Sequence, residues 1–371
     1  MSERWALQLC HSHYGPFADV ARQYAEVLKR AGFRVLTAYL TGAADERVRL
    51  RSASDEVVFL GFSSRAVGGL KIDAIRAVRR LCGYRHFELV VAHRFKPIYI
   101  ACLATRLPVI GVHHAFGDYA RRGRRVFAGL FQRRLTLLGV SDAVREDIRQ
   151  SLPSWPSSRI RTLHNRIDVD AIKAGLLTRE QARQLLRLPP DAFVVANVGR
   201  LHPDKDQATL IRGFAHARPR LPEGAILAIA GSGPLEQALR ALAGAMDVAE
   251  SVRFLGQVPD IWKAFPAFDV FALSSDHEPF GMVLLEAMAA GIPVVATNCG
   301  GAPEVVGELG GQFDLGDEQG LAERLGEAAL IGDKDRRLYA RRAESRLRER
   351  FSDDAAAAVF AGILKDVLGD G

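Results

Sequence analysis

The stretch SSDHEPFGMVLLEAMAAGIPVVATNCGGAPEVV, residues 274–306, decides the fold of this chain. It continues the apolar run DVFALSS, residues 269–275, which has the character of a buried strand. Pro279 is expected at the start of a helix that runs through MVLLEAMAAG and ends at Gly291-Ile292-Pro293, before the next strand PVVAT. A strand, a helix and a second strand in this order predict a parallel sheet covered by helices.

Two carboxylates belong to this unit. Glu278 lies in the loop before the helix and Glu286 lies on a nearby flank, about 80° past two full turns. Carboxylates placed in this way can each hold a different sugar ring of one extended ligand. The N–H groups around Phe280, Gly281 and Met282 are the donors of a helix start, which is a site for an anion. The alternative is that Glu278 caps the helix and Glu286 is simply solvated.

The same alternation continues through both halves of the chain, so the predicted class is α/β with two doubly wound domains. At 371 residues the chain is long enough for two domains. The proline turn at the end of QARQLLRLPPD follows the junction, and we place the boundary near residue 170: residues 1–170 form one domain and residues 171–353 the other. Ligands of such sheets bind beyond the carboxyl ends of the strands.

Residues 278–295 reproduce the pattern E-P-F-G-x-x-x-x-E-A-M-A-x-G-x-P-V-V, and here the chain resembles the GT-B glycosyltransferases, in particular glycosyltransferase family 4. The resemblance implies two Rossmann-like domains that face each other across a cleft, with a terminal helix, about residues 354–371, crossing back to the first. It also implies that Glu278 holds hydroxyls of the donor sugar and that Glu286 holds the ribose. The nucleotide site would include Phe280, Gly281, Met282 and Val283.

A second match is VVANVGRLHPDKDQATLIRGF, residues 194–214. By resemblance, Arg200 and Lys205 neutralise the leaving nucleotide diphosphate, whereas taken alone they would be ordinary surface charges. The segments AGSGPLEQAL and VRFLGQVP match further nucleotide-side loops, which adds Gly231, Gly233 and Val258 to the predicted site. The full G-x-G-x-x-G pattern is absent, so an oxidoreductase with a dinucleotide cofactor is disfavoured.

The first half matches less closely. In HSHYGPFADVARQYAEVLKRAG, Gly15 falls on the first glycine of a family loop, and Pro16, which has no N–H, replaces the second. In the run PVIGVHHAFGD, His114 falls where the family carries a histidine, and the resemblance implies that it lies near the donor sugar. His113 is the alternative, because neighbouring strand residues point to opposite faces. FELVVAH ends at His93, which is either an acceptor contact or a plain strand-end histidine.

The charge of the chain is uneven. Its formal net charge is +7, yet residues 1–170 carry 28 basic and 15 acidic side chains and the remainder is acidic overall. The segment YARRGRRVFAGLFQRRLTLL predicts a basic amphipathic helix. It would lie on an anionic membrane surface, bind acceptor phosphates, or pack with a solvated basic face. The arginines assigned to this acceptor or membrane surface are Arg121, Arg122, Arg124 and Arg125.

Several classes are disfavoured. The four cysteines form no C-x-x-C pair, and no stretch of about 18 apolar residues is present to span a bilayer. The start MSERWALQLC lacks the pattern of a secretory signal, so we expect a cytoplasmic protein, peripheral on the inner membrane at most. The D-x-D strings at Asp168 and Asp204 do not resemble a metal site, and no metal or other cofactor is expected. A nucleic-acid binder would explain the basic charge, but the sequence shows neither a clear helix-turn-helix nor aromatics interleaved with Lys and Arg, so this class is disfavoured.

The predicted function is transfer of a hexose, with retention of configuration, from a nucleotide-sugar to a glycan. A UDP-sugar donor is the choice that the family favours. The acceptor expected from the resemblance is lipopolysaccharide core or another lipid-linked or phosphorylated bacterial glycan. The alternatives are a nucleotide-sugar epimerase or a phosphorylase-like enzyme on the same fold, and a non-enzymatic basic binding protein.

Overall fold

The computed structural model describes residues 3–14 and 17–369. The chain divides into two compact units, of which the first comprises Met1–Asn165 with Asp353–Gly371 and the second Arg166–Ser352. The division precedes the boundary that we placed near residue 170, because the chain already packs with the second unit from Arg166 onward. The last helix, α15 (Asp353–Leu368), belongs to the first unit and packs against α1 (Phe17–Arg30).

The first unit is built on a seven-stranded sheet in the order β3-β2-β1-β4-β5-β6-β7, and every pairing in it is parallel. The strands are β1 (Trp5–Cys10), β2 (Arg34–Thr41), β3 (Glu56–Phe62), β4 (Leu89–His93), β5 (Val109–His113), β6 (Leu135–Gly139) and β7 (Ile160–Thr162). Besides α1 and α15, the helices are α2 (Glu46–Arg51), α3 (Ile72–Tyr84), α4 (Phe95–Ala104), α5 (Arg122–Leu130) and α6 (Asp142–Ser151). The inner strands are buried along their whole length, as expected for a parallel sheet covered on both faces.

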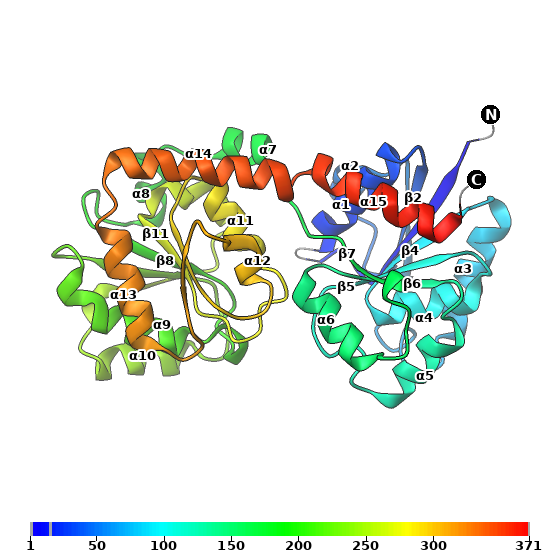
Figure 1. Ribbon diagram of the computed structural model, residues 1–371, viewed down its shortest axis with the longest axis horizontal. Helices are drawn as coiled ribbons and strands as arrows, with labels where there is room; N and C mark the ends of the chain where they lie inside the picture. The colour runs from blue at the N-terminus through cyan, green and yellow to red at the C-terminus, as the bar shows by residue number, and fades with distance from the viewer. Residues whose placement is uncertain (1–2, 15–16, 370–371) are drawn as a thin grey trace. The chain divides into compact units, whose positions relative to one another are not determined.

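The second unit has a six-stranded parallel sheet in the order β10-β9-β8-β11-β12-β13 (Figure 1). The strands are β8 (Val194–Val198), β9 (Ile226–Ala230), β10 (Val252–Gly256), β11 (Val270–Leu273), β12 (Val294–Thr297) and β13 (Gly311–Phe313). The helices are α7 (Val169–Gly175), α8 (Arg179–Leu186), α9 (Gln207–Ala217), α10 (Glu236–Ala245), α11 (Met282–Ala289), α12 (Ala302–Val306), α13 (Glu318–Ala329) and α14 (Asp333–Arg350). Short 3₁₀ turns include Pro203–Lys205 and Ile261–Ala267.

Helices cover both faces of the second sheet. In Figure 1, α9, α10 and α13 lie on one side of it and α8, α11 and α14 on the other. Helices α9 and α13 approach closely because Gly213 has no side chain: a Cβ there would lie 2.5 Å from Cδ2 of Leu321. The core of this layer is aliphatic and aromatic, with Phe214, Leu227 and Leu325 among its buried members.

The strand order reverses at one place in each sheet, beside β1 in the first and beside β8 in the second. Open α/β sheets bind ligands at such a switch point, outside the carboxyl ends of the strands. In the second unit the loops that leave β8 and β11 meet there, and they carry Arg200, Lys205 and Glu278. The fold therefore gathers the predicted cations and the first predicted carboxylate at one edge of the sheet.

One expectation about local structure is wrong. Helix α11 begins at Met282 and not at Pro279, because its N-cap, Gly281, has φ of +96° and breaks any helix that starts earlier. Glu278 therefore lies in the loop before the helix and does not cap it. Among the described residues, no helix combines the length and the apolar character needed to cross a membrane.

Candidate active site

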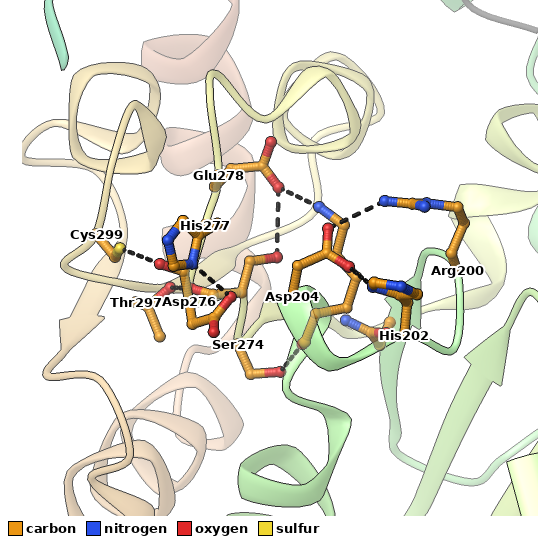
Figure 2. A network of polar contacts seen from close by, with 12 residues as sticks. Arg200, His202, Asp204, Ser274, Asp276, His277, Glu278, Thr297 and Cys299 are labelled. Carbon is orange, nitrogen blue, oxygen red and sulfur yellow. Dashed lines mark hydrogen bonds and ion pairs between the residues drawn. The ribbon is translucent and has the colours of Figure 1, made fainter. Parts of the chain in front are cut away.

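Three loops of the second unit are joined by hydrogen bonds into one network (Figure 2). The loop after β11 is bonded to the loop after β8 through Ser274 Oγ, which donates to the carbonyl of Lys205 at 3.0 Å. It is bonded to the end of β12 through Thr297 Oγ1, which donates to the carbonyl of Ser275 at 2.7 Å. The backbone that carries Glu278 is thus held between two fixed neighbours.

Lys205 and Glu278 form the central contact of the network. Lys205 Nζ donates to Glu278 Oε2 at 2.8 Å, and Ser275 Oγ donates to the same oxygen at 3.3 Å. The side chains of Lys205 and Glu278 are only 18% and 10% exposed. Such a pair is screened by solvent far less than one on the surface. The ammonium predicted to hold the diphosphate and the carboxylate predicted to hold the sugar are therefore direct partners in this structure.

Arg200 has its own carboxylate partner. Its Nη2 donates to Asp204 Oδ2 at 3.0 Å, and its side chain is 68% exposed. The other oxygen of Asp204 contacts Nδ1 of His202. Burial opposes ionisation of Asp204, but the His202 contact and the cations of Lys205 and Arg200 outweigh it and hold the pKa of this carboxyl below its usual value. Arg200 is thus available to a ligand from solvent, with its position set by Asp204.

The start of α11 is built on close backbone packing. A Cβ on Gly300 would lie 2.2 Å from the carbonyl oxygen of Glu278, and the N–H of Gly301 donates to that same oxygen at 2.8 Å. The side chain of Phe280 is buried against Phe351, with ring centroids 5.7 Å apart, so Phe280 offers a ligand its backbone only. Met282, Val283 and Glu286 are partly exposed in the first turns of the helix.

Gly231 and Gly233 have a packing role that we did not predict. We attributed them to close approach of a nucleotide, but a Cβ on Gly231 would lie 1.8 Å from the carbonyl oxygen of Gly199. A Cβ on Gly233 would lie 2.2 Å from the carbonyl oxygen of Leu201. These glycines therefore let the loop after β9 pack on the loop that carries Arg200. Val258, after β10, is partly buried.

Sequence reasoning missed several members of the network. Asp204 follows Arg200 by four residues in one loop, so a pairing between them was open to prediction, but we discussed this aspartate only as part of a D-x-D string. Ser275, Thr297 and Cys299 carried no such signal. The thiol of Cys299 donates to the carbonyl of Asp276 at 2.7 Å, and burial, together with the nearby Asp276 carboxylate, raises its pKa.

The aspartates of the two D-x-D strings are engaged locally. Asp168 accepts from the N–H of Ala171 as the N-cap of α7, and Asp206 caps α9 through Thr209. Asp170 pairs with Arg348, and Asp204 with Arg200. Each of these carboxylates therefore has a cap or an ion pair to explain its position.

In the first unit, three predicted or alternative histidines lie at the ends of neighbouring strands. His93 Nδ1 lies 3.2 Å from His114 Nε2, with the rings stacked. His113 is fully buried: its Nδ1 lies 2.7 Å from Asp118 Oδ2, and its Nε2 lies 3.2 Å from the hydroxyl of Tyr119. Of the neighbouring pair, only His114 is partly exposed. Gly15 and Pro16 lie outside the described residues.

The basic helix α5 is partly structural. Arg124 Nη1 donates to the carbonyl and to Oδ1 of Asp118, at 2.9 and 3.0 Å, so this arginine is not the free surface cation that we expected. Phe127 is half-buried and packs against the rings of Phe95, Tyr99 and Phe131. The exposed apolar side chains of this helix are Val126 and Leu130, and they are flanked by Arg121, Arg122 and the partly exposed Arg125.

Burial lowers the pKa of both stacked histidines. The pKa of His93 falls to about 3, and that of His114 falls well below its usual value because of burial and of the neighbouring His93, His113 and Arg94. Both imidazoles are therefore neutral at pH 7, so one ring donates a hydrogen bond and the other accepts it. The two histidines predicted for separate roles, at the acceptor and at the donor sugar, form one hydrogen-bonded unit.

Comparison with known proteins finds a family model for each half of the chain. Residues 178–345 match the family model of glycosyl transferases group 1, and residues 18–171 match that of glycosyltransferase family 4. One relative, 36% identical over 184 residues, is the lipopolysaccharide core biosynthesis glycosyltransferase LpsE of Rhizobium meliloti, with 49% of this chain and 52% of LpsE covered. Another is a GDP-mannose-dependent phosphatidylinositol monomannoside mannosyltransferase of Mycobacterium tuberculosis, 37% identical over 192 residues, with 49% of each chain covered. The chain thus spans about half the length of these curated relatives.

A solved structure matches along nearly the whole chain. Anabaena Alr3699/HepE in complex with UDP and glucose superposes with a TM-score of 0.79 at 22% identity, covering 98% of this chain and 100% of that one. At this identity the match supports the fold and nothing finer. The two family models together account for most of the chain, one in each unit. The protein is therefore a member of the GT-B glycosyltransferases, with a group 1 domain that follows a family 4 domain, and it resembles enzymes of lipopolysaccharide core biosynthesis.

Proposed function

We propose that the protein transfers a hexosyl group from a nucleotide-sugar to a glycan acceptor with retention of anomeric configuration. The observation that carries the proposal is the meeting of Arg200, Lys205 and Glu278 at the switch point of the second sheet. Two cations and a carboxylate at this place suit a diphosphate joined to a sugar. The relatives named above act on nucleotide-sugars or on bacterial glycans and glycolipids, which agrees with this assignment.

The proposed chemistry relies on electrostatic stabilisation. Arg200 and Lys205 neutralise the charge that develops on the departing diphosphate, so the bond between the anomeric carbon and the phosphate oxygen breaks to give an oxocarbenium-like sugar. The acceptor hydroxyl attacks from the same face, and a phosphate oxygen of the donor takes its proton. Glu278 accepts hydrogen bonds from hydroxyls of the sugar, and Glu286 accepts them from hydroxyls of the ribose. With these side chains in place, no metal ion is required by the proposal.

We propose UDP as the nucleotide, since HepE, which shares the fold, binds UDP. GDP is the alternative that the mycobacterial relative represents. For the acceptor we propose lipopolysaccharide core or another lipid-linked or phosphorylated bacterial glycan, in line with LpsE. The first unit, with His93, His114, the exposed Arg121 and Arg122 and the partly exposed Arg125, is proposed to meet this acceptor or the anionic membrane surface that carries it. We therefore propose that the protein works in the cytoplasm, at the inner face of the membrane.

A binding screen tests the donor site. The purified protein is titrated with UDP, GDP, ADP and a panel of their sugar conjugates by ligand-observed NMR, with and without EDTA, and the screen is repeated with Glu286→Ala. We expect one nucleotide to bind selectively, to bind more weakly to the variant, and to be indifferent to EDTA. Binding of no nucleotide would refute the donor site. Release of free nucleotide from a nucleotide-sugar without any acceptor would point instead to an epimerase.

A further inference from the structure

The cations of the candidate donor site are paired with carboxylates of the same site. Each predicted phosphate-binding cation has an internal carboxylate, Asp204 for Arg200 at 3.0 Å and Glu278 for Lys205 at 2.8 Å. The two pairs differ in burial, because the Arg200 side chain is 68% exposed and that of Lys205 only 18%. Solvent screens the first pair, whereas the second is largely shielded from it. Lys205 is therefore the cation whose own partner competes most strongly with an incoming anion.

We propose that Glu278 is an internal competitor of the donor diphosphate for Lys205, and that the diphosphate must displace it before Glu278 can accept the hydroxyls of the sugar. The inference rests on the proposed function and concerns the order of events at that same site. Phosphate oxygens that reach Lys205 Nζ bring a second anion next to the Glu278 carboxylate. Two neighbouring anions that solvent screens poorly repel each other, so the Glu278 carboxylate turns away from the phosphate.

The exchange is confined to side chains. The backbone carbonyl of Glu278 accepts from Gly301 N–H at 2.8 Å, and the Cα of Gly300 packs so closely that a Cβ would lie 2.2 Å from that carbonyl oxygen. The backbone of Glu278 is thus fixed, and only rotation of its side chain moves the carboxylate. When Lys205 binds phosphate, the Glu278 carboxylate loses its closest donor, since the contact from Ser275 Oγ is longer at 3.3 Å, and the carboxylate needs a further donor. A sugar hydroxyl supplies one.

Donor recognition then becomes sequential within one ligand. The diphosphate displaces Glu278 from Lys205, and the displaced carboxylate then accepts hydrogen bonds from the hydroxyls of the sugar. A free monosaccharide meets a carboxylate that is already paired with Lys205, so it binds poorly until a nucleotide diphosphate is present. We expect the two halves of the donor to bind with positive coupling, which is reciprocal by thermodynamic necessity.

The test is a double-mutant cycle read by isothermal titration calorimetry with UDP, GDP and ADP in separate arms. The four proteins are wild type, Glu278→Gln, Lys205→Met and the double variant. Glu278→Gln keeps the size of the side chain and the acceptor for Ser275 but removes the ion pair. We expect this variant to bind the cognate diphosphate about three- to tenfold more tightly than wild type, where tenfold corresponds to about 1.4 kcal/mol. In the Lys205→Met background the same change should bring no gain.

The control is Glu344→Gln, which removes an equivalent carboxylate from the Lys173–Glu344 pair on the surface of the same unit and should leave diphosphate affinity unchanged. A gain for Glu278→Gln that persists without Lys205 would reflect the loss of negative charge alone and would overturn the competition. No gain in either background would overturn it as well, while leaving the donor site intact. If wild type bound none of the three nucleotides, the proposed function itself would fall, and this inference with it.

Discussion

His93 Nδ1 lies 3.2 Å from His114 Nε2, and the two rings stack with centroids 5.5 Å apart. They come from the ends of β4 and β5, which are neighbours in the first sheet. Burial keeps both rings neutral at pH 7 by lowering their pKa values. This relationship makes the strand ends of the first unit sensitive to acid.

The free energy of unfolding should therefore decrease as the pH is lowered, and His93 should account for part of this loss. The pKa of His93 is about 3 in the folded protein against 6.5 as its ordinary value, so below pH 6.5 the unfolded chain takes up a proton that the folded one refuses. The resulting destabilisation is absent above pH 6.5 and grows as the pH falls, by at most about 1.4 kcal/mol per pH unit. Urea unfolding of His93→Gln between pH 7 and 4.5 should show a shallower loss than wild type. The exposed His86→Gln serves as the control, and an equal slope in both variants would contradict the assignment.

Alanine at Gly231 should damage both the fold and the donor site. Its Cβ would fall 1.8 Å from the carbonyl oxygen of Gly199, and its φ of +137° suits glycine alone. We expect a loss of more than about 1 kcal/mol in the free energy of unfolding and weakened nucleotide binding. Gly244→Ala is the matched control, since nothing lies within 4 Å of the added Cβ in α10 and the change should stabilise that helix slightly. Thermal unfolding and calorimetry check both.

Removal of either cation should slow turnover of the donor. By analogy with loss of an oxyanion-hole donor, Lys205→Ala and Arg200→Ala should each lower kcat on the order of 10²–10³-fold. We expect the larger effect from Lys205, because its side chain is 18% exposed against 68% for Arg200. Lys173→Ala, on the surface of the same unit, should turn over donor normally. Wild-type kcat in either site variant would remove that residue from the active-site assignment.

Contact with an anionic membrane should depend on two arginines of α5, the exposed Arg122 and the partly exposed Arg125. Arg122→Gln combined with Arg125→Gln is the variant of choice, because Arg124 is bonded to Asp118 and its replacement would disturb the fold. At about 1 kcal/mol per arginine, we expect partitioning onto vesicles with anionic lipid to fall about tenfold or more. Arg337→Gln with Arg341→Gln on α14 removes the same charge from the other unit. Unchanged sedimentation with vesicles for the α5 variant would argue against membrane contact there.

Much of the fold was readable from local patterns. The alternation of buried strands and amphipathic helices gave two parallel sheets, since such patterns depend on neighbours in sequence. The start of α11 was misplaced because Pro279 is compatible with a helix start, while the positive φ of Gly281 that delays it is a property of the folded loop. From the sequence we named Gly281, but only as a residue that lets a ligand approach closely.

The contacts of the site were harder to predict. Lys205 and Glu278 are 73 residues apart, and only the adjacency of β8 and β11 in the sheet brings their loops together. Alternation along a strand indicated that His113 and His114 face opposite ways, but not that His113 would be fixed by Asp118. Arg124 is a partly buried partner of the same aspartate and not a free surface cation, and no local sequence pattern gives the position of Asp118.

The buried ring of Phe280 links the donor loop to the place where the chain leaves the second unit. Phe280 packs on Phe351, and the carbonyl of Phe351 accepts from the N–H of Ile167, just after the chain enters. The segments that enter and leave the second unit are thus hydrogen-bonded to each other beside the loop of Glu278. A substitution that displaces the Phe280 ring would therefore disturb the entry and the exit of the second unit together, because both connections share this packing with the loop of Glu278.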